Sequence, residues 1–591
     1  MKKYWQSLDD LAAGPSPDKF QDIPAIISEI SDPVTRRRFL SLMGASMALA
    51  GFVGCRRPLE HIVPYVKAPE EIVPGVANYY ATTMPFGNNA YGLVVESHEG
   101  RPTKIEGNKN HPSTLGRSNP FIQASVLSLY DPDRSQVVTH NGAESTWEDF
   151  ISFWREQSPA LSANGGAGLT ILCGPFSSPT LARLKDQFLK TYPKAKWGTY
   201  EPVSDENIYE GIKLASGKAY QPVYHFEKAK VILSLDSDFL YSESDSIRNA
   251  KGFTDGRRIK SEHDDMNRLY VAESAYTITG AMADHRLAIP SSDIGYFAIA
   301  VAKELKRQGL TLPDSEPLDN FNRGNFDNNW IRVVASDLLD AKGKSLILAG
   351  RNQPPQVHAL VFALNSALGN IGKSVGYRYI YDDTHSSLSD LSSLCDDLKR
   401  GEISTLIILG GNPVYNTSSD LAFGDLLKNV KHTIHLSEYA DETSNLCQWH
   451  LPETHYLEGW GDARSIDGTL SVIQPLIAPL YDGRSLVEII NLITNGQEAR
   501  GYDLVRDVWK SILWPVNYER DRQRLLNDGL YWENPSPEEV PRVNNKAIFY
   551  QATLRSIDNR LGINNLEINF RPSPTLYDGR YANNAWLQEL P

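Results

Sequence analysis

A short run of small and polar residues, Gly410-Gly411-Asn412-Pro413, has the residue types best suited to ligand binding. It follows Thr405 and the four apolar residues at 406–409, a run that predicts a buried strand. Ligands of parallel sheets bind just beyond the carboxyl ends of the strands, so a nucleotide could approach the backbone here. The alternative is a plain tight turn. On spacing alone we favour the turn, because neither GxGxxG nor GxxxxGK[ST] accompanies the run.

Other polar residues also follow predicted strands. Asp236, Ser237 and Asp238 end the apolar run that begins at 229, where they could meet a cation or a ribose. Such residues are also common as simple loop entries. Cys173 ends another apolar run, and we expect a buried structural thiol there in preference to a metal ligand.

Two histidines and a carboxylate, His450, His455 and Glu458, superficially resemble a metal-ligating set. Their spacing fits no familiar helical motif, and Pro452 lies between the histidines. We therefore do not expect a metal ion at these residues.

The glycine run would be positioned by four predicted elements, which follow one another along the chain as a strand, a turn, a helix and a second strand. Residues 345–350 predict a strand, and residues 357–372 predict a helix in which Leu360, Leu364 and Leu368 line one buried face. Gly369 or Gly372 can end this helix in a left-handed conformation. With the strand at 405–409, the order predicts two parallel strands joined by a crossover helix, which is half of a doubly wound sheet.

Earlier segments show the same alternation. The apolar runs at 169–174, 229–240 and 268–274 predict strands, and 178–192 predicts a helix. Residues 91–108 predict a hairpin that turns at Glu99-Gly100-Arg101. A helix is expected to begin at Ser145, with Glu148 completing a capping box.

The composition limits the classes of function. A chain of 591 residues predicts three to five domains. A net charge of −13 and a pI near 5.6 argue against nucleic acid as a partner. The four cysteines, Cys55, Cys173, Cys395 and Cys447, form no CxxC pair, and so few do not make a disulfide scaffold.

The first 54 residues have the order of an export signal, with basic residues before a short apolar run rich in Gly, Ala and Ser. The run is too short and too weakly apolar to predict a transmembrane helix. Arg36 and Arg37, followed by Phe39 and Leu40, resemble a twin-arginine signal; a basic helix start is the alternative.

The apolar run closes at Cys55, whose surroundings resemble a lipobox except that Phe52 stands where Leu is usual. Cys55 is therefore a lipidation candidate, the alternative being a lone cysteine. A single acyl chain binds membranes only marginally, so stable attachment would need more chains or a membrane partner. Four prolines make 55–75 an extended linker.

The succession of motifs across 75–591 resembles the molybdopterin oxidoreductase superfamily. The matching segments, in chain order, are GRPTKIEGN, LYDPDR, LILAG, HALVFALNSALGNIGK, ILGGNP and HLPETHYLEGWGDARSIDG. MNRLYVAES (266–274), TGAMADHRL (279–287) and the long leader resemble one branch, the large periplasmic subunit of alternative complex III, a quinol:cytochrome c oxidoreductase.

The resemblance implies an α/β fold with two doubly wound lobes. The expected domains are an export signal at 1–54, a linker at 55–75, a β-rich region at 76–165, α/β lobes at 166–340 and 341–496, and the start of a C-terminal β-barrel domain at 497–591. That barrel would be only partly encoded, and we expect either a separate chain to supply the remainder or a longer natural protein.

Departures from the superfamily pattern bear on the mechanism. A [4Fe–4S] cluster needs thiolates, and the hairpin that would carry them, at 79–93, has no cysteine. No molybdenum ligand can be placed on a matching motif. Pro290-Ser291-Ser292-Asp293 stands where relatives often have Pro-Gly-Thr-Asp, so a side chain replaces a glycine. Only Gly410–Pro413 matches the nucleotide-side signature, which makes it a vestigial pterin-nucleotide turn.

These features predict a cofactor-free scaffold subunit on the periplasmic face of the membrane, in a quinol-oxidising complex. Expected partners are an iron–sulfur ferredoxin-like module, an integral-membrane quinol-binding subunit and c-type cytochromes. The [4Fe–4S] and [3Fe–4S] clusters would lie on a partner or in a missing C-terminal half. One alternative is an active oxidoreductase holding Mo or W on bis-molybdopterin guanine dinucleotide, with Cys173 as a remote candidate ligand. An unrelated exported nucleotide-binding protein is a third hypothesis.

Overall fold

The computed structural model describes residues 73, 75–262, 264–320, 326–380, 385–513, 517–533, 536–544 and 566–590. The chain divides into two compact units, Met1–Ile72 and Val73–Pro591, and the described residues belong to the second. The expected signal residues Arg36, Arg37, Phe39 and Leu40, and the lipidation candidate Cys55, lie outside the described residues.

The N-terminal region is an antiparallel sheet of β1 (Asn78–Phe86), β2 (Asn89–His98) and β3 (Arg101–Gly107). The expected hairpin is confirmed: Glu99 and Gly100 turn with φ of +53° and +81°. Helix α4 (Pro120–Leu129) packs Ile122 and Leu129 into the same core as Leu93 and Val95.

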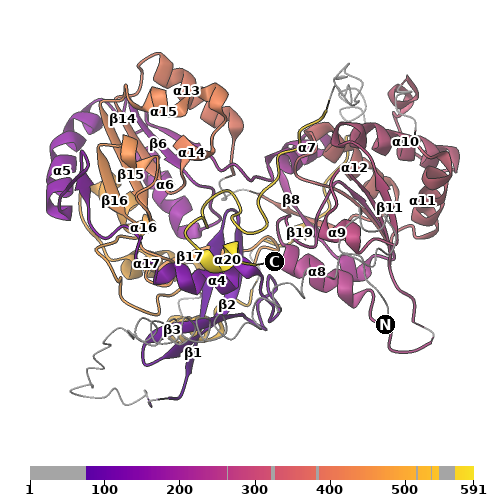
Figure 1. Cartoon of the computed structure of the whole chain (residues 1–591), viewed down its shortest axis with the longest axis horizontal. Coiled ribbons are helices and arrows are strands. Elements are labelled where there is room, and N and C mark those ends of the chain that lie inside the picture. Colours follow the sequence, from indigo (N-terminus) through magenta and orange to yellow (C-terminus); the bar gives the residue numbers. More distant parts are fainter. Residues whose placement is uncertain are drawn as a thin grey trace, which may run out of the picture. The chain divides into compact units, whose positions relative to one another are not determined.

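A seven-stranded sheet, in the order β5-β4-β16-β15-β14-β6-β7, forms the first α/β layer. Its strands are β4 (Thr139–His140), β5 (Ala143–Glu144), β6 (Leu169–Cys173), β7 (Lys196–Thr199), β14 (Thr405–Leu409), β15 (His432–Ser437) and β16 (Trp449–Pro452). The five from β16 to β7 run parallel. Figure 1 shows orange late strands and violet early chain in this one sheet.

Helices cover both faces of this sheet. Alternate residues of β14 divide between two cores: Ile407 and Leu409 face one, and Leu406 and Ile408 face the other. The first core includes side chains of α5 (Trp147–Ala163), α6 (Pro179–Thr191) and α16 (Leu486–Asn495), and the second those of α13 (Leu388–Lys399) and α15 (Phe423–Leu427). Burial on both faces explains the continuous apolar run that identified this strand.

A four-stranded parallel sheet, in the order β11-β10-β9-β12, forms the second α/β layer. It contains β9 (Val231–Leu235), β10 (Arg268–Glu273), β11 (His285–Ala288) and β12 (Ser345–Ala349). Its core includes residues of α7 (Glu206–Ser216), α8 (Ser246–Asp255), α10 (Ile294–Arg307), α11 (Asn328–Asp340) and α12 (Pro355–Ala367).

The remaining described elements are short or peripheral. One small sheet contains β8 (Tyr220–Tyr224), β13 (Val375–Tyr379) and β19 (Glu538–Glu539), and another contains β17 (Gly461–Arg464) and β18 (Leu470–Ile473). The other helices are α9 (Ile278–Ala281), α14 (Pro413–Asn416), α17 (Gly501–Ile512), α18 (Tyr518–Asp528) and α20 (Ala585–Gln588). Within the described part of 497–591, no barrel is closed.

The strand pairing differs from the expectation at the centre of the chain. β12 and β14 were expected in one doubly wound sheet, yet β12 pairs with β9 in the four-stranded sheet and β14 pairs with β6 and β15 in the seven-stranded sheet. The four-stranded sheet and its helices are therefore inserted between β7 and α13. Strands from both sides of residue 341 therefore share the seven-stranded sheet.

Two local expectations at helix ends have different outcomes. The capping box of α5 joins Thr146 to Asp149, one residue later than the expected pair of Ser145 and Glu148, because Trp147 is the first helical residue. Helix α12 ends at Ala367, and Gly369 and Gly372 both take positive φ, as expected for glycines that follow a helix.

Among the helices of the described chain, none combines the length and apolar character needed to cross a bilayer.

Candidate functional site

The glycine turn lies at the carboxyl end of β14. Gly410 and Gly411 both have φ of +71°, the region that glycine adopts without strain. The Gly410 N–H donates to the Leu436 carbonyl at 2.8 Å, and the Gly411 carbonyl accepts from His435 Nε2 at 3.0 Å. A Cβ placed on Gly411 would meet nothing within 4 Å, so the backbone is open to an approaching group there.

The residues that follow are bound within the protein. Asn412 Nδ2 donates to Glu442 Oε2 at 2.6 Å, and Asn412 Oδ1 accepts from Thr443 Oγ1 at 2.7 Å. Pro413 is buried as the first residue of the four-residue helix α14. Both polar atoms of the Asn412 side chain are therefore occupied by neighbouring residues.

Two half-buried carboxylates lie at the same edge of the sheet. Glu438 follows β15 and Glu453 follows β16. Burial raises the pKa of Glu438 to about 7 and that of Glu453 to about 8, and the charge of Glu438 adds to the rise at Glu453. Glu453 Oε2 lies 3.9 Å from the Cβ position of Gly410, so acidic groups border the glycine turn.

His450, His455 and Glu458, at which no metal ion was expected, each contact other residues of the protein. Glu458 forms a buried bidentate pair with Arg134, at 3.1 and 2.7 Å. His450 Nε2 contacts Ser135 Oγ at 2.6 Å, and His455 Nδ1 accepts from the Leu457 N–H at 3.3 Å. Throughout the described residues, no group of three His, Cys, Asp or Glu side chains is arranged to hold a metal ion.

The described cysteines are buried thiols. Cys173, at the end of β6, is 2% exposed, and burial raises its pKa to about 12, with the charge of Glu453 as a second cause. Burial also raises the pKa of Cys395 and Cys447. Metal coordination requires the thiolate, and these environments favour the neutral thiol.

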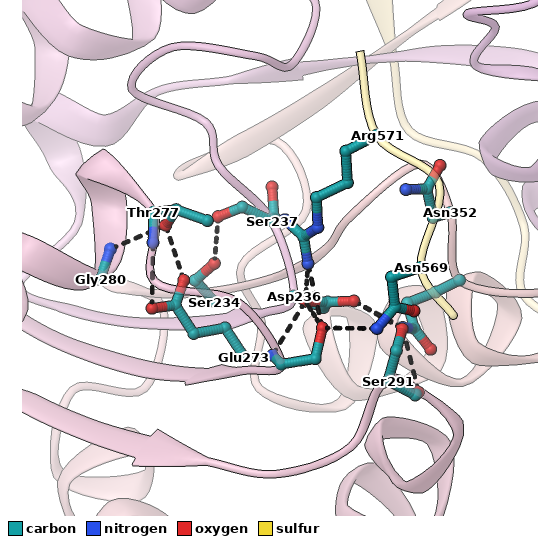
Figure 2. Close-up of polar contacts among 12 residues, drawn as sticks. Ser234, Asp236, Ser237, Glu273, Thr277, Gly280, Ser291, Asn352, Asn569 and Arg571 are labelled. Atoms are coloured by element: carbon teal, nitrogen blue, oxygen red, sulfur yellow. Dashed lines mark hydrogen bonds and ion pairs between the residues drawn. The ribbon is translucent and has the colours of Figure 1, made fainter. Parts of the chain in front are cut away.

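The carboxyl edge of the four-stranded sheet carries a larger polar cluster around Asp236 (Figure 2). Asp236 follows β9 with φ of +54° and is 6% exposed. Its carboxylate accepts hydrogen bonds from three neighbouring elements and from a distant segment. The donors are Ser274 N and Oγ at 3.3 Å each, Ser291 Oγ at 2.7 Å, Gln353 Nε2 at 3.1 Å and Arg571 Nη2 at 2.7 Å.

Of the three strand-end residues Asp236, Ser237 and Asp238, the first forms an ion pair within the protein, with the guanidinium of Arg571. Asp238 instead accepts from Thr279 N at 3.1 Å and Oγ1 at 2.8 Å, and the Ser237 carbonyl accepts from Ser234 Oγ at 2.8 Å. Two of the three residues therefore act as loop supports.

The Pro290–Asp293 segment also takes part in this cluster. The Ser291 hydroxyl donates to Asp236, so the side chain that replaces the relatives' glycine is used inside the protein. Ser292 N donates to Glu567 Oε1 at 3.0 Å, and Ser292 Oγ to Glu567 Oε2 at 3.2 Å. Glu567, from late in the chain, thus accepts the hydrogen bond of the Ser292 backbone N–H at this edge.

A cavity of about 690 Å³ lies beside this edge. Aromatic side chains line much of it, and its charged lining residues include Glu201, Asp205, Glu243, Arg351 and Arg571. Arg351 is buried and pairs with Glu243 at 3.1 Å and Asp205 at 3.4 Å. Burial raises the pKa of Glu201 to about 7, against the lowering effect of Arg580. The turn at 410–413 does not line this cavity.

Sequence reasoning missed these cavity residues and the late segment that reaches Asp236. Arg351 begins the RNQPPQ turn after β12, and its charge directly after an apolar run was the available signal. Arg571 carried no local signal, since its partner lies 335 residues away.

A pterin dinucleotide would meet a fold of this kind at the two strand-end edges. Glu438 and Glu453 border the glycine turn, and burial keeps these carboxyls neutral up to about pH 7 and 8, so they would repel its diphosphate only above those values. At the carboxyl edge of the four-stranded sheet, two groups could hold a ligand, the Ser292 N–H and the Asp236 carboxylate. The first is bound by Glu567 and the second by Arg571. The open backbone at Gly411 is the feature that would suit such a group.

Two similarities to known proteins bear on the fold and the family. No family model matches the sequence. The chain is 23% identical over 449 residues to the menaquinone reductase, molybdopterin-binding-like subunit, of Nitratidesulfovibrio vulgaris, covering 69% of this chain. The match spans 64% of the length of that relative.

Among solved structures, acetylene hydratase from Pelobacter acetylenicus superposes with a TM-score of 0.54 at 12% identity, covering 70% of this chain and 69% of that one. At this identity the likeness shows a shared fold. The two similarities support the molybdopterin oxidoreductase superfamily, so the resemblance expected from the motifs is confirmed at that level.

Proposed function

We propose that this chain, with its molybdopterin oxidoreductase-like fold, is a structural subunit of a quinone-linked electron-transfer complex and carries no pterin of its own. It would dock an iron–sulfur ferredoxin-like module, an integral-membrane quinol-binding subunit and c-type cytochromes, as in alternative complex III. Electrons would pass through those partners. The named relative, a molybdopterin-binding-like subunit of menaquinone reductase, supports this assignment.

The observation that carries the proposal is the covered edge of the four-stranded sheet. Ligands of such sheets bind beyond the carboxyl ends of the strands. Here Asp236 is paired with Arg571 and the Ser292 N–H is bound by Glu567, so the chain's own side chains use the groups that a ligand would need.

The export and membrane parts of the proposal rest on the sequence. Arg36, Arg37, Phe39 and Leu40 would direct export by the twin-arginine route, which carries proteins that are already folded. Cys55, if lipidated, would anchor the chain at the periplasmic face, together with a membrane partner.

Purification of the full chain from its native membranes through an affinity tag tests the proposal. We expect an iron–sulfur protein, a c-type cytochrome and a polytopic membrane protein in stoichiometric amounts by mass spectrometry. The matched control replaces the signal arginines (Arg36→Lys and Arg37→Lys), and the same partners should then be lost. Recovery of the unaltered chain from membranes without these three partners would contradict the scaffold role.

A second candidate function is an active Mo or W oxidoreductase with bis-molybdopterin guanine dinucleotide. The open backbone at Gly411 is the observation that favours it. In that case Cys173, as the candidate ligand, should be indispensable. Turnover that is unchanged in Cys173→Ala would remove it from this role.

A further inference from the structure

A late segment of the chain, residues 566–577, lies along the covered edge of the four-stranded sheet; we call it the strap. Its first part is extended, and its side chains alternate. Leu566, Ile568 and Phe570 point to solvent, at 79%, 76% and 85% exposure. Glu567 and Arg571 point toward the sheet and make its polar contacts. A segment held by apolar burial would turn its apolar side chains inward, whereas this one turns them to solvent. Hydrogen bonds and an ion pair of Glu567 and Arg571 therefore hold the strap in place.

The guanidinium of Arg571 is bound by groups from two strand ends. Nη2 donates to Asp236 Oδ1 after β9, at 2.7 Å, and to Ser274 Oγ after β10, at 3.1 Å. The Asp236 side chain is 1% exposed and that of Arg571 is 26% exposed. A carboxylate this deeply buried requires a charged or hydrogen-bonding partner, and Arg571 supplies the positive charge.

The carboxylate of Glu567 is bound four residues earlier. It accepts from the N–H and hydroxyl of Ser292, in the turn (Ser291–Asp293) that leads into α10. Between the two anchors, Asn352 Nδ2 donates to the Phe570 carbonyl at 3.1 Å. The edge therefore recognises a negative group, a backbone carbonyl and a positive group in that order. Figure 2 shows Arg571 and Asn569 beside Asp236, while Asn352 lies next to the late segment drawn in pale yellow.

Beyond Arg571 the strap forms part of the cavity wall. Pro572, Ser573, Pro574 and Thr575 line the cavity, and Tyr241 donates its hydroxyl to the Pro574 carbonyl. The Tyr577 ring lies 4.9 Å from that of Phe86 and 5.7 Å from that of Phe121. The polar anchors and this aromatic contact hold the strap at both ends.

We propose that the carboxyl edge of the four-stranded sheet is a peptide-binding site whose ligand is the chain's own strap. The site takes an extended segment with a carboxylate and a guanidinium four residues apart, the spacing of Glu567 and Arg571. The strap thereby occupies the place where a doubly wound sheet binds its ligand. The inference concerns this edge alone and does not depend on the scaffold role.

Hydrogen–deuterium exchange on the full chain tests the occupancy. The variant carries Glu567→Ala and Arg571→Ala, and the matched control carries Ile568→Ala, which removes an outward side chain of the same strap. We expect the Ser292 amide to exchange at least tenfold faster in the double variant and at the original rate in the control. Equal exchange in the double variant and the unaltered chain would overturn the proposal.

A synthetic peptide of residues 566–577, labelled at its N-terminus, tests recognition in trans by fluorescence anisotropy. The double variant should bind this peptide at least tenfold more tightly than the unaltered chain, whose site is filled. A peptide with Arg571→Ala should lose at least tenfold in affinity. Equal binding of both peptides to the double variant would overturn the proposal.

If the double variant fails to fold, Glu567→Gln and Arg571→Lys replace it. These keep the size of the first side chain and the charge of the second, so their folding is less at risk. Each should still speed the Ser292 exchange, because the charge of Glu567 or the fork of Arg571 is lost. Unchanged exchange in both would refute the recognition of a carboxylate and a guanidinium.

Discussion

Replacing Glu453 with Gln should stabilise the protein at alkaline pH. The carboxyl of Glu453 has a folded-state pKa of about 8, against an ordinary value of 4.5, because burial and the charge of Glu438 disfavour its ionised form. The folded state therefore holds a proton that the unfolded state releases. The resulting penalty is absent below pH 4.5, grows as the pH rises, and is complete above about pH 8.

The size of the effect follows from the same shift. At about 1.4 kcal/mol per pH unit, the full penalty is at most about 5 kcal/mol. Solvent reaches this sheet edge in part, so we expect Glu453→Gln to raise the free energy of unfolding by about 1–3 kcal/mol at pH 8.5 and by less than about 0.5 kcal/mol at pH 5. Glutamine keeps the shape of the side chain and removes its charge.

Urea unfolding at the two pH values measures this difference. Glu210→Gln is the matched control, because Glu210 is 46% exposed in a surface pair with Lys213, and it should change the midpoint little at either pH. A Glu453→Gln variant that loses stability at pH 8.5, or gains equally at both values, would refute the raised pKa of Glu453.

Three further predictions concern buried groups. Glu458→Gln leaves the buried Arg134 charge unpaired, so it should lower the free energy of unfolding in urea by about 3–5 kcal/mol. The combined Arg134→Met and Glu458→Leu variant removes both charges and should lose less stability. Equal losses in the two variants would contradict this. The three buried thiols, Cys173, Cys395 and Cys447, should resist alkylation at pH 8 until the chain unfolds. Peptide mass spectrometry can follow the labelling, and rapid labelling of Cys173 in the folded protein would contradict its burial. Asp462→Ala should lower the free energy of unfolding by about 2–4 kcal/mol, because Ser178, Thr180 and Trp509 would lose their buried acceptor. The loss should appear as a lower thermal midpoint, and an unchanged midpoint would contradict it.

The local elements could be predicted because their signals are local. The apolar run at 405–409 is a strand because both of its faces are buried, and Gly410 and Gly411 follow it with the positive φ expected of a turn. The hairpin around Gly100 and the helix at 178–192 depend on equally local patterns. Their positions could therefore be read from residue type and spacing.

Pairing and site assembly could not be predicted in the same way. β12 and β14 have similar apolar sequences, and nothing in either one specifies that β9 is the partner of the first and β6 of the second. Asp236 was a candidate from its place after a strand, but its cation comes from Arg571, 335 residues further along. Such contacts depend on the packing of the whole lobe.

The most direct measurement is an analysis for molybdenum, tungsten and iron on the full chain purified from its native membranes and then separated from its partners, together with the fluorescence of oxidised pterin released by denaturation. The scaffold account predicts that the separated chain retains none of the three metals and no pterin. Near-stoichiometric molybdenum or tungsten with pterin would contradict it and would make the chain an enzyme.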